Sequence, residues 1–415
     1  MSPKEGQSLI TDFNQAMVLA AIRAKDEGVS RVELTERTGL SAQTISNVVR
    51  RLINDGWIRE SGRVIRGPGK PRTTLQLVAD RCIAIGIHAD FSTLELVLID
   101  LNGDVLSQRR QPFEESWSSV EVQVAEVQRL VVAMLSEANI GMDRVLGVGI
   151  ASSGHINTET GVMHHPYIWD GPGFAVVEPL EEALGCPVYL TRDMVAATMA
   201  ERWVGIGRTV SHFMTVYAGA GLGAGLVSNH EVIVGHRGNA GDFTHLEVPY
   251  AQEETCPMCG RNNCLYINLE PPALKRLFAA EGVEMPDMTG IPAYAEAEVL
   301  LACLNPTKFD SQGVKRVRER LLSMVSGCVG EIVGMLDQDK VVVSGPLWEH
   351  VREDYGETLA EQVRSRAEGV VWSPVEIVPT ELGPWIAPLG AACIVLDAAL
   401  MPRRTFTASP AATAS

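Results

Sequence analysis

The feature that most constrains the fold of this chain is a duplicated pattern of strands and turns. Residues 82–111, "CIAIGIHADFSTLELVLIDLNGDVLSQRRQ", predict a strand, a turn, a strand, an Asn-Gly turn and a third strand. Residues 212–235, "HFMTVYAGAGLGAGLVSNHEVIVG", repeat this plan with a glycine-rich first turn. Helical segments and further apolar strands follow each copy. The duplication predicts two α/β lobes that face each other across a cleft, where ligands are expected near strand ends.

Length and charge predict a separate unit in front of these lobes. The chain has 415 residues and a net charge of −16. Residues 1–80 carry 12 Lys/Arg against 9 Asp/Glu, whereas the remainder carries 23 against 42. This asymmetry favours an anion-binding module on an acidic body, with a merely solvated basic face as the alternative. No apolar run reaches the roughly 18 residues of a membrane span, and the start lacks a secretory pattern, so a cytoplasmic location is expected.

The first eighty residues predict a helix-turn-helix. A helix up to Gly28 is followed by a short helix, a turn at Gly39 and a long helix from 41 to 54. Ser41 is placed as the N-cap of the long helix. Its predicted buried face has helical spacing and consists of Ile45, Val48, Val49, Leu52 and Ile53. The opposite face presents short polar groups first and arginines further along, which is typical of a helix that reads base edges and then contacts phosphate.

After Trp57 the chain predicts a hairpin with a basic tip, "RGPGKPR", which suits a minor groove or the DNA backbone. A helix-turn-helix can also serve only for packing or dimerisation, so the basic hairpin and the charge asymmetry decide for DNA binding. The predicted DNA-binding residues are Gln43, Thr44, Ser46, Asn47, Arg50, Arg51, Arg66, Lys70 and Arg72.

Three of the eight cysteines lie within nine residues, in "CPMCGRNNC" from Cys256 to Cys264. The other five each stand alone in apolar surroundings and are predicted to pack in the core. Cys-x-x-Cys is a good zinc spacing. The alternatives are a redox-active pair or unrelated buried thiols.

Several motifs together resemble the ROK family, which groups sugar kinases with sugar-responsive repressors. They are "GVGIASSGHINTETGV", "RDMVAATMAE", "GAGLGAGL", "NAGDFTHLEV", "CPMCGRNNCL" and "LGAACIVL". The resemblance spans about residues 12 to 400. It implies an α/β fold in which an N-terminal winged helix-turn-helix precedes a duplicated, actin-like (ribonuclease-H-type) domain of two lobes.

The residue patterns and the resemblance together give the expected domain boundaries. They are 1–80 for the DNA-binding domain, 81–200 for the first lobe, which the C-terminal helix at about 386–400 rejoins, 201–385 for the second lobe with the zinc site, and 401–415 for a disordered tail.

The resemblance implies one structural zinc ion per chain, bound by His245, Cys256, Cys259 and Cys264. Three thiolates and one imidazole form a closed tetrahedral site that suits zinc. The family usually has one residue between the first two cysteines, where this chain has two, and Asn263 replaces a usual glycine.

Kinases of the family hold ATP with an Asp-x-Gly-Gly-Thr turn. This chain has "GIHADFST", in which His88 replaces the aspartate while Asp90 and Phe91 replace the glycines. Since glycines let the backbone approach phosphates closely, we expect ATP binding and kinase activity to be lost, and no catalytic residue is assigned. The second-lobe "AGAGLGAG" remains, but it can act as a tight turn without phosphate.

The implied sugar site is also altered. Asp193 matches the kinases' catalytic base, although it can equally be a surviving structural carboxylate. Arg192 and Val195 replace asparagines. The expected effector-binding residues are Tyr167, Arg192, Asp193, Asp242, His245 and Tyr266. The added arginine predicts a phosphorylated or acidic effector, or else no small-molecule effector.

The resulting hypothesis is a transcriptional regulator, in the form of a repressor, of carbohydrate genes. Its expected partners are an inverted-repeat operator, a sugar or sugar-derived effector, and further copies of itself in a homodimer or homotetramer. The alternatives are a sugar kinase with an added DNA-binding domain and a regulator controlled by a partner protein, with a vestigial cleft.

Overall fold

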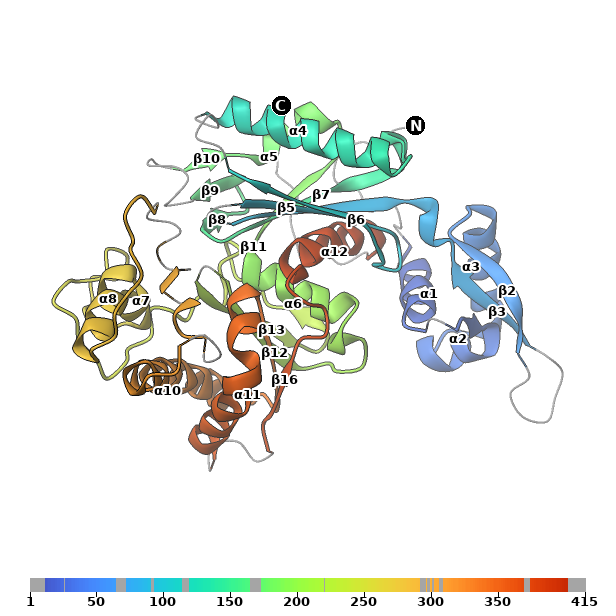
Figure 1. The fold of residues 1–415 in the computed structure, drawn as a ribbon. Coiled ribbons are helices and arrows are strands. Elements are labelled where there is room, and N and C mark those ends of the chain that lie inside the picture. Colours follow the sequence, from blue (N-terminus) through green and yellow to red (C-terminus); the bar gives the residue numbers. More distant parts are fainter. Residues whose placement is uncertain are drawn as a thin grey trace.

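The computed structural model describes residues 12–25, 27–64, 72–90, 93–113, 119–164, 173–219, 221–291, 296, 299–300, 302–305, 309–368 and 374–401. Among these residues, a small N-terminal unit lies beside a larger body with two five-stranded sheets and one small three-stranded sheet (Figure 1). The predicted fold class, a winged helix-turn-helix followed by a duplicated α/β domain, is confirmed. In the described part of the chain, no helix is both long and apolar enough to span a bilayer.

The N-terminal unit has three helices and a three-stranded sheet of order β1-β3-β2. Each helix begins at a side chain that accepts a backbone N–H: Asp12, Ser30 and Ser41. Gly39 ends α2 in the left-handed conformation, with φ 69°. The elements are α1 (Phe13–Arg23), β1 (Val29–Ser30), α2 (Arg31–Thr38), α3 (Ala42–Asn54), β2 (Ile58–Val64) and β3 (Arg72–Leu77).

The first helix ends earlier than the sequence predicted. Its last residue is Arg23, whereas Gly28 was expected to end it. Gly28 instead has φ 83° and lies where the chain turns into β1. Its missing side chain leaves room for β3, because a Cβ at this position would lie 3.1 Å from the carbonyl oxygen of Leu75.

The first sheet of the body has the order β11-β7-β4-β5-β6 and mixes parallel and antiparallel pairs. Helices α4 and α5 cover its outer face (Figure 1). The elements of this lobe are η1 (Ala79–Arg81), β4 (Ile83–Ala89), β5 (Thr93–Ile99), β6 (Val105–Pro112), α4 (Val120–Glu137), η2 (Met142–Arg144), β7 (Val145–Ser152), β8 (His155–Asn157), β9 (Val162–His164), β10 (Phe174–Ala175), α5 (Val177–Leu184) and β11 (Val188–Arg192).

The second sheet repeats the plan, with order β14-β13-β12-β15-β16. Helices α10 and α11 cover its outer face. Asn229 and His230 form the tight turn between β13 and β14, both with positive φ, as a type I′ hairpin requires. The elements are η3 (Ile206–Arg208), β12 (Phe213–Ala218), β13 (Leu222–Ser228), β14 (Glu231–Val232), α7 (Leu265–Leu269), α8 (Pro271–Ala280), α10 (Gln312–Leu336), β15 (Lys340–Ser344), α11 (Pro346–Ala367) and β16 (Glu376–Pro379).

Two helices, α6 (Asp193–Trp203) and α12 (Ile386–Leu400), lie between the sheets. Helix α12 packs on the first sheet, α6 packs on the second, and the two helices pack on each other. Glycines make this close packing possible. A Cβ on Gly86 of β4 would overlap the backbone of Pro388, and one on Gly390 would overlap the backbone of Ala196.

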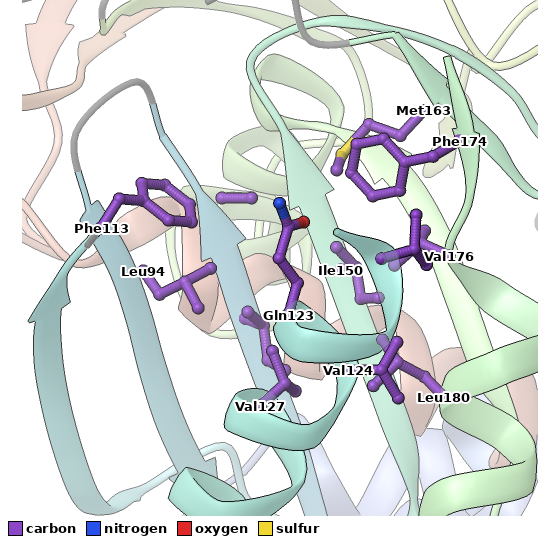
Figure 2. Close-up of a pocket in the computed structure, with 13 residues that line it drawn as sticks. Leu94, Phe113, Gln123, Val124, Val127, Ile150, Met163, Phe174, Val176 and Leu180 are labelled. Atoms are coloured by element: carbon purple, nitrogen blue, oxygen red, sulfur yellow. The ribbon is translucent and has the colours of Figure 1, made fainter. Parts of the chain in front are cut away.

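An apolar cavity of about 40 Å³ lies between α4 and the outer face of the first sheet. Figure 2 shows Val124 and Val127 of α4 pointing toward it, opposite Leu94 and Ile150 of the sheet. The remaining wall includes Phe174. The cavity is too small for a metabolite, and we interpret it as a packing defect.

Candidate functional site

The exposed face of α3 presents the side chains that the sequence predicted for base contacts. Gln43 and Asn47 are exposed and lie one helical turn apart, and Nε2 of Gln43 donates to Oδ1 of Asn47 over 3.3 Å. Thr44 and Ser46 are partly buried, and their hydroxyls contact Ser41 and the Ala42 carbonyl oxygen. Opposite them, Ile45, Val48, Val49 and Leu52 are buried as predicted, and Ile53 is partly buried.

The two arginines of α3 differ in their surroundings. Arg50 is exposed, and its side chain is available for a phosphate. Arg51 is also exposed but lies 3.8 Å from the Asp55 carboxylate, measured from Nε to Oδ2. In the amide orientation that satisfies both groups, the oxygen of Gln15 in α1 accepts from Nε and Nη1 of Arg51. Arg51 therefore also joins α3 to α1.

The predicted wing is an antiparallel hairpin of β2 and β3. Arg72 begins β3 and is exposed. Arg66 and Lys70 lie outside the described residues. The structure thus confirms the hairpin, and the roles of its cations stay predictions.

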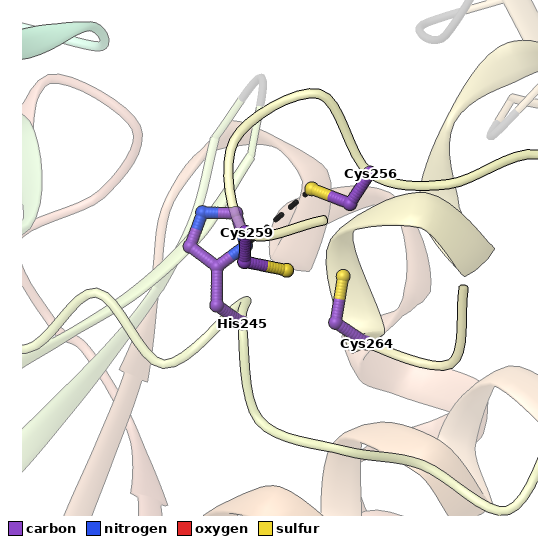
Figure 3. Close-up of side chains that lie close together, drawn as sticks. All are labelled: His245, Cys256, Cys259 and Cys264. Carbon is purple, nitrogen blue, oxygen red and sulfur yellow. Dashed lines mark hydrogen bonds between the residues drawn. The ribbon is translucent and has the colours of Figure 1, made fainter. Parts of the chain in front are cut away.

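The four predicted metal ligands come together in the second lobe. The ligand atoms of His245, Cys256, Cys259 and Cys264 all lie within 4.8 Å of one another (Figure 3). The Sγ atom of Cys256 is 3.7 Å from Nδ1 of His245. A tetrahedron with zinc–sulfur bonds of about 2.3 Å and zinc–nitrogen bonds of about 2.0–2.1 Å has a sulfur–nitrogen edge of about 3.6 Å. The donor set and this edge fit zinc.

Backbone hydrogen bonds hold the ligand loop in place. The N–H of Cys256 donates to Arg261 and that of Gly260 donates back to Cys256, over 2.7 and 2.9 Å. Gly260 has φ 72°, which a glycine adopts without strain. Cys264 precedes α7, and its carbonyl oxygen accepts from the buried Asn268. The extra residue in the Cys-x-x-Cys spacing is therefore accommodated as a closed turn.

The predicted effector residues form two groups. Arg192, Asp193 and Asp242 make a charged cluster, in which Nη1 of Arg192 is 3.6 Å from Asp242 and Nε is 4.0 Å from Asp193. Arg192 and Asp193 are buried, and Asp242 is partly buried. Tyr266 instead lies against His245 of the candidate metal site, with ring centroids 5.5 Å apart. Tyr167 lies outside the described residues.

Two groups of the charged cluster were missed from the sequence. Nε2 of His155 lies 3.3 Å from Asp242, and the amide oxygen of Asn239 accepts from Nη1 of Arg192 over 3.5 Å. Asn239 also bonds to both backbone groups of Ile156 and so fixes β8 to the second lobe. Asn239 lies in the motif "NAGDFTHLEV", which was its only signal.

The carboxyl groups of the cluster titrate in opposite directions. Burial raises the pKa of Asp193, and the nearby Arg192 and His88 offset this only in part. Burial also acts to raise the pKa of Asp242, but contacts with His155, Arg192 and Thr244 outweigh it, so this pKa is lowered. A proton in the cluster is therefore held more readily by Asp193 than by Asp242.

The residue at the expected phosphate turn is tied to its own sheet. His88 is 2% exposed, and its Nδ1 lies 3.3 Å from Oε2 of Glu95 on the adjacent strand. Nε of Arg110 on the third strand donates to Glu95 over 2.9 Å. A charged triplet, His88, Glu95 and Arg110, thus crosses β4, β5 and β6. Glu95 and Arg110 were not predicted, although Glu95 is a lone charge in the apolar strand "TLELVLI".

The glycines of the second-lobe hairpin have packing roles. A Cβ on Gly225 would overlap Oγ1 of Thr198 in α6, and one on Gly223 would lie 2.8 Å from the sulfur of Met194. Gly221, at the turn, has open space around its Cβ position. The close approach of α6 is sufficient to explain why Gly223 and Gly225 are glycines, and no bound phosphate is needed for that explanation.

Comparison with known proteins gives matches over both parts of the chain. The model of the ROK family matches residues 82–398, and the model of the MarR family matches residues 11–64. The xylose repressor of Caldicellulosiruptor bescii is 26% identical over 268 residues, which cover 62% of this chain and 64% of the repressor. The match therefore spans less than two thirds of that relative's length.

Solved structures support the fold. A ROK family transcriptional regulator, described as a homologue of the E. coli MLC protein, aligns with a TM-score of 0.74 at 20% identity, covering 94% of this chain and 98% of the regulator. The ROK hexokinase of Thermus thermophilus aligns with a TM-score of 0.60 at 23% identity, covering 75% of this chain and 97% of the enzyme. At these identities the likeness concerns the fold alone.

Proposed function

The chain belongs to the ROK family, and from this premise we propose that it is a DNA-binding transcriptional regulator, acting as a repressor of carbohydrate genes. The observation that carries the proposal is a winged helix-turn-helix whose exposed α3 face is polar and ends in Arg50, joined to a ROK body. In this proposal Gln43, Thr44, Ser46 and Asn47 contact bases, while the predicted arginines and Lys70 contact phosphates.

The test is a titration of operator and scrambled duplex at several salt concentrations. The operator is first selected from genomic fragments and is expected to be an inverted repeat. Asn47→Ala should weaken operator binding by about 1–3 kcal/mol and leave the scrambled duplex unaffected. Arg72→Ala should weaken both and lower the salt slope by roughly 0.9. Lys315→Ala is the control, because Lys315 is a partly exposed cation of the body. A wild-type protein that selects no fragment would contradict the proposal.

We also propose that the effector is a sugar or sugar derivative bound near Arg192, Asp193, Asp242 and His245. The expectation of an anionic effector loses its main argument, because Asp242 and Asp193 already neutralise the buried Arg192. A neutral sugar, which offers hydroxyl groups to carboxylates and imidazoles, suits this cluster better. A thermal-shift panel of neutral and phosphorylated sugars distinguishes a neutral from an anionic effector, since a ligand specific for the folded protein raises its unfolding temperature.

Zinc is the metal that the donor set favours. In the proposal it is a structural ion held by His245, Cys256, Cys259 and Cys264, with no position left for a substrate. When bound, it fixes the loop that carries His245 beside Tyr266. The oligomer that an inverted repeat requires, a homodimer or homotetramer, is likewise part of the proposal.

A sugar kinase is the second candidate, because the hexokinase shares the fold. Against it, His88 and its partner Glu95 occupy the strands that lead into the expected phosphate turn. The glycines that bring backbone N–H groups to a triphosphate in the family's kinases are replaced here by Asp90 and Phe91, and the aspartate of that turn by His88. A coupled kinase assay over a panel of hexoses should stay at background. Turnover that Asp193→Asn abolishes would favour the kinase instead.

A further inference from the structure

The DNA-binding unit contacts the body through the last residue of its first helix. The guanidinium carbon of Arg23 lies 3.7 Å from the centroid of the Trp203 ring, at a distance typical of a cation–π contact. Nη1 of Arg23 also donates to the carbonyl oxygen of Trp203. Nη2 of Arg208 in turn donates to the carbonyl oxygen of Arg23 over 3.3 Å. The end of α1 is thus fixed to the ends of α6 and η3.

An apolar core and a buried ion pair surround the contact between Arg23 and Trp203. Apolar residues of α1, α6 and α12 belong to one continuous core, which includes Leu19, Trp203 and Ile394. Asp397 of α12 is 1% exposed and pairs with Nη1 of Arg202 over 2.6 Å. Burial lowers the pKa of Arg23 to about 10, so its guanidinium remains charged near neutral pH.

A second connection is the short segment between β3 and β4. The N–H of Val78 donates to the carbonyl oxygen of Trp57, and Arg81 lies over the Trp57 ring at 4.6 Å. The N–H of Leu101 in the body donates to the carbonyl oxygen of Ala79 over 3.0 Å. Within the described residues, the unit is therefore held at these two separate points at least, and its orientation depends on both.

Helix α6 leads from the first of these points to the charged cluster. It begins at Asp193 and ends at Trp203, and its 11 residues span about 16 Å. All of them except Arg202 are buried. Its backbone packs directly on α12, because Gly390 leaves no side chain between that helix and Ala196. Such a helix moves as a rigid body.

We propose that Arg23 is a positioning residue through which α6 couples the charged cluster at Asp193 to the orientation of the DNA-binding unit. A change at the N-terminal end of α6 shifts Trp203, and the Arg23 contact transmits this shift to α1. The consequence for DNA affinity rests on the proposed function, whereas the mechanical coupling does not.

The test is a double-mutant cycle read by hydrogen exchange of the α1 amides, which requires neither DNA nor effector. Asp193→Asn changes the cluster with almost no change in shape. It should alter α1 exchange at least about threefold in the otherwise unchanged chain and leave it unaltered in Arg23→Met. Arg23→Met alone should speed this exchange about tenfold, and Arg23→Lys should restore part of the protection.

Arg320→Met is the matched control, because Arg320 stacks on Tyr250 of the body at 4.0 Å in the same kind of contact. The effect of Asp193→Asn on α1 should survive in that background. If Asp193→Asn does not fold, Arg192→Lys perturbs the same cluster. Additive effects of the two substitutions, or no response of α1 to the cluster variant, overturn the proposal.

The functional readout is the operator affinity of the four proteins of the cycle: the wild type, Asp193→Asn, Arg23→Met and the double variant. Asp193→Asn should change operator affinity at least about threefold only where Arg23 is present. If the chain binds no duplex DNA, the proposed function fails, yet the exchange cycle still decides the coupling. If Asp193→Asn changes operator affinity equally in the wild-type and Arg23→Met backgrounds, Arg23 does not transmit the change.

Discussion

The two lobes contain the same kind of hairpin, but the side chains on the two hairpins differ. In the first lobe, β4 and β5 carry His88 and Glu95, which pair across the strands at 3.3 Å. In the second lobe, β13 carries Gly223 and Gly225, against which α6 packs. One copy carries the charged triplet of His88, Glu95 and Arg110, in which His88 and Glu95 are buried, whereas the other carries small residues.

The difference shows that a retained glycine motif is weak support for a retained ligand. The motif "GAGLGAGL" persists where a helix needs the space, since a Cβ on Gly225 would overlap Thr198. At the first-lobe turn, His88, Asp90 and Phe91 stand where the family's kinases have an aspartate and two glycines. Packing and phosphate binding both favour glycine, so the two explanations need separate tests.

The proposed metal centre should give the largest effect on stability. Within the described residues, its four ligand side chains lie in the second lobe, so the effect should begin there. Cys264→Ser should remove the metal and lower the free energy of unfolding by on the order of 4 kcal/mol or more, since the metal's binding energy contributes to folding. Elemental analysis measures the zinc, and hydrogen exchange measures which lobe opens. The second lobe should lose protection first.

Cys186→Ser is the control for this prediction, because Cys186 is a partly buried thiol of the first lobe outside the cluster. It should keep the zinc. Wild-type protein that carries no zinc when its thiols are reduced would rule out the metal centre.

The glycine comparison predicts the next largest effect. Gly225→Ala should destabilise the protein by about 2 kcal/mol, because the new Cβ forces β13 and α6 apart. Gly221→Ala should change the stability little, because its Cβ position is open. Thermal unfolding of both variants, with and without ATP, separates packing from phosphate binding. A Gly221 variant that loses an ATP-induced stabilisation would restore the phosphate explanation.

The sequence was sufficient for the fold because the signals for it are local. Alternating residues of β12 and β4 divide between two faces, and turn residues such as Asn229 separate the strands. The metal ligands were also predictable, since Cys256 and Cys259 are close in sequence and the family resemblance supplied His245.

The charged clusters were harder to predict because their members are distant in sequence. Arg192 is paired with Asp242, fifty positions later, and Asp242 with His155. Without these partners, Arg192 was interpreted as a cation free to bind an anion. Burial and pairing remove the main argument for that interpretation, which itself stays untested, and neither feature can be read from residue type alone.

The charged triplet of the first lobe predicts a pH dependence of stability. Burial acts to lower the pKa of His88, but the hydrogen bond to Glu95 and the charges of Asp90, Glu95 and Asp193 outweigh it, so the pKa is raised. The pair therefore contributes fully below the ordinary pKa of 6.5, and its contribution is lost as the pH rises through the higher folded-state value.

At low pH, the contribution of the pair is limited by protonation of Glu95. Burial acts to raise its pKa, but His88 and Arg110 outweigh burial, so it is lowered and the contribution is lost only on strong acidification. Hydrogen exchange of β4 and β5 amides measures the effect locally. His88→Gln should cost about 1.5 kcal/mol at about pH 6 and less at about pH 9. A cost that does not depend on pH would show that His88 is neutral.

The smallest predicted effect concerns the cavity beside the first sheet, whose volume is about 40 Å³. Val124 points toward it from α4 (Figure 2). Val124→Ile adds one methylene where space exists and should raise the free energy of unfolding by up to about 0.8 kcal/mol. Val132→Ile on the same helix is the control, because Val132 is 55% exposed and gains no burial. If Val124→Ile destabilises the lobe, the cavity walls are rigid and the void does not have the shape of the added group.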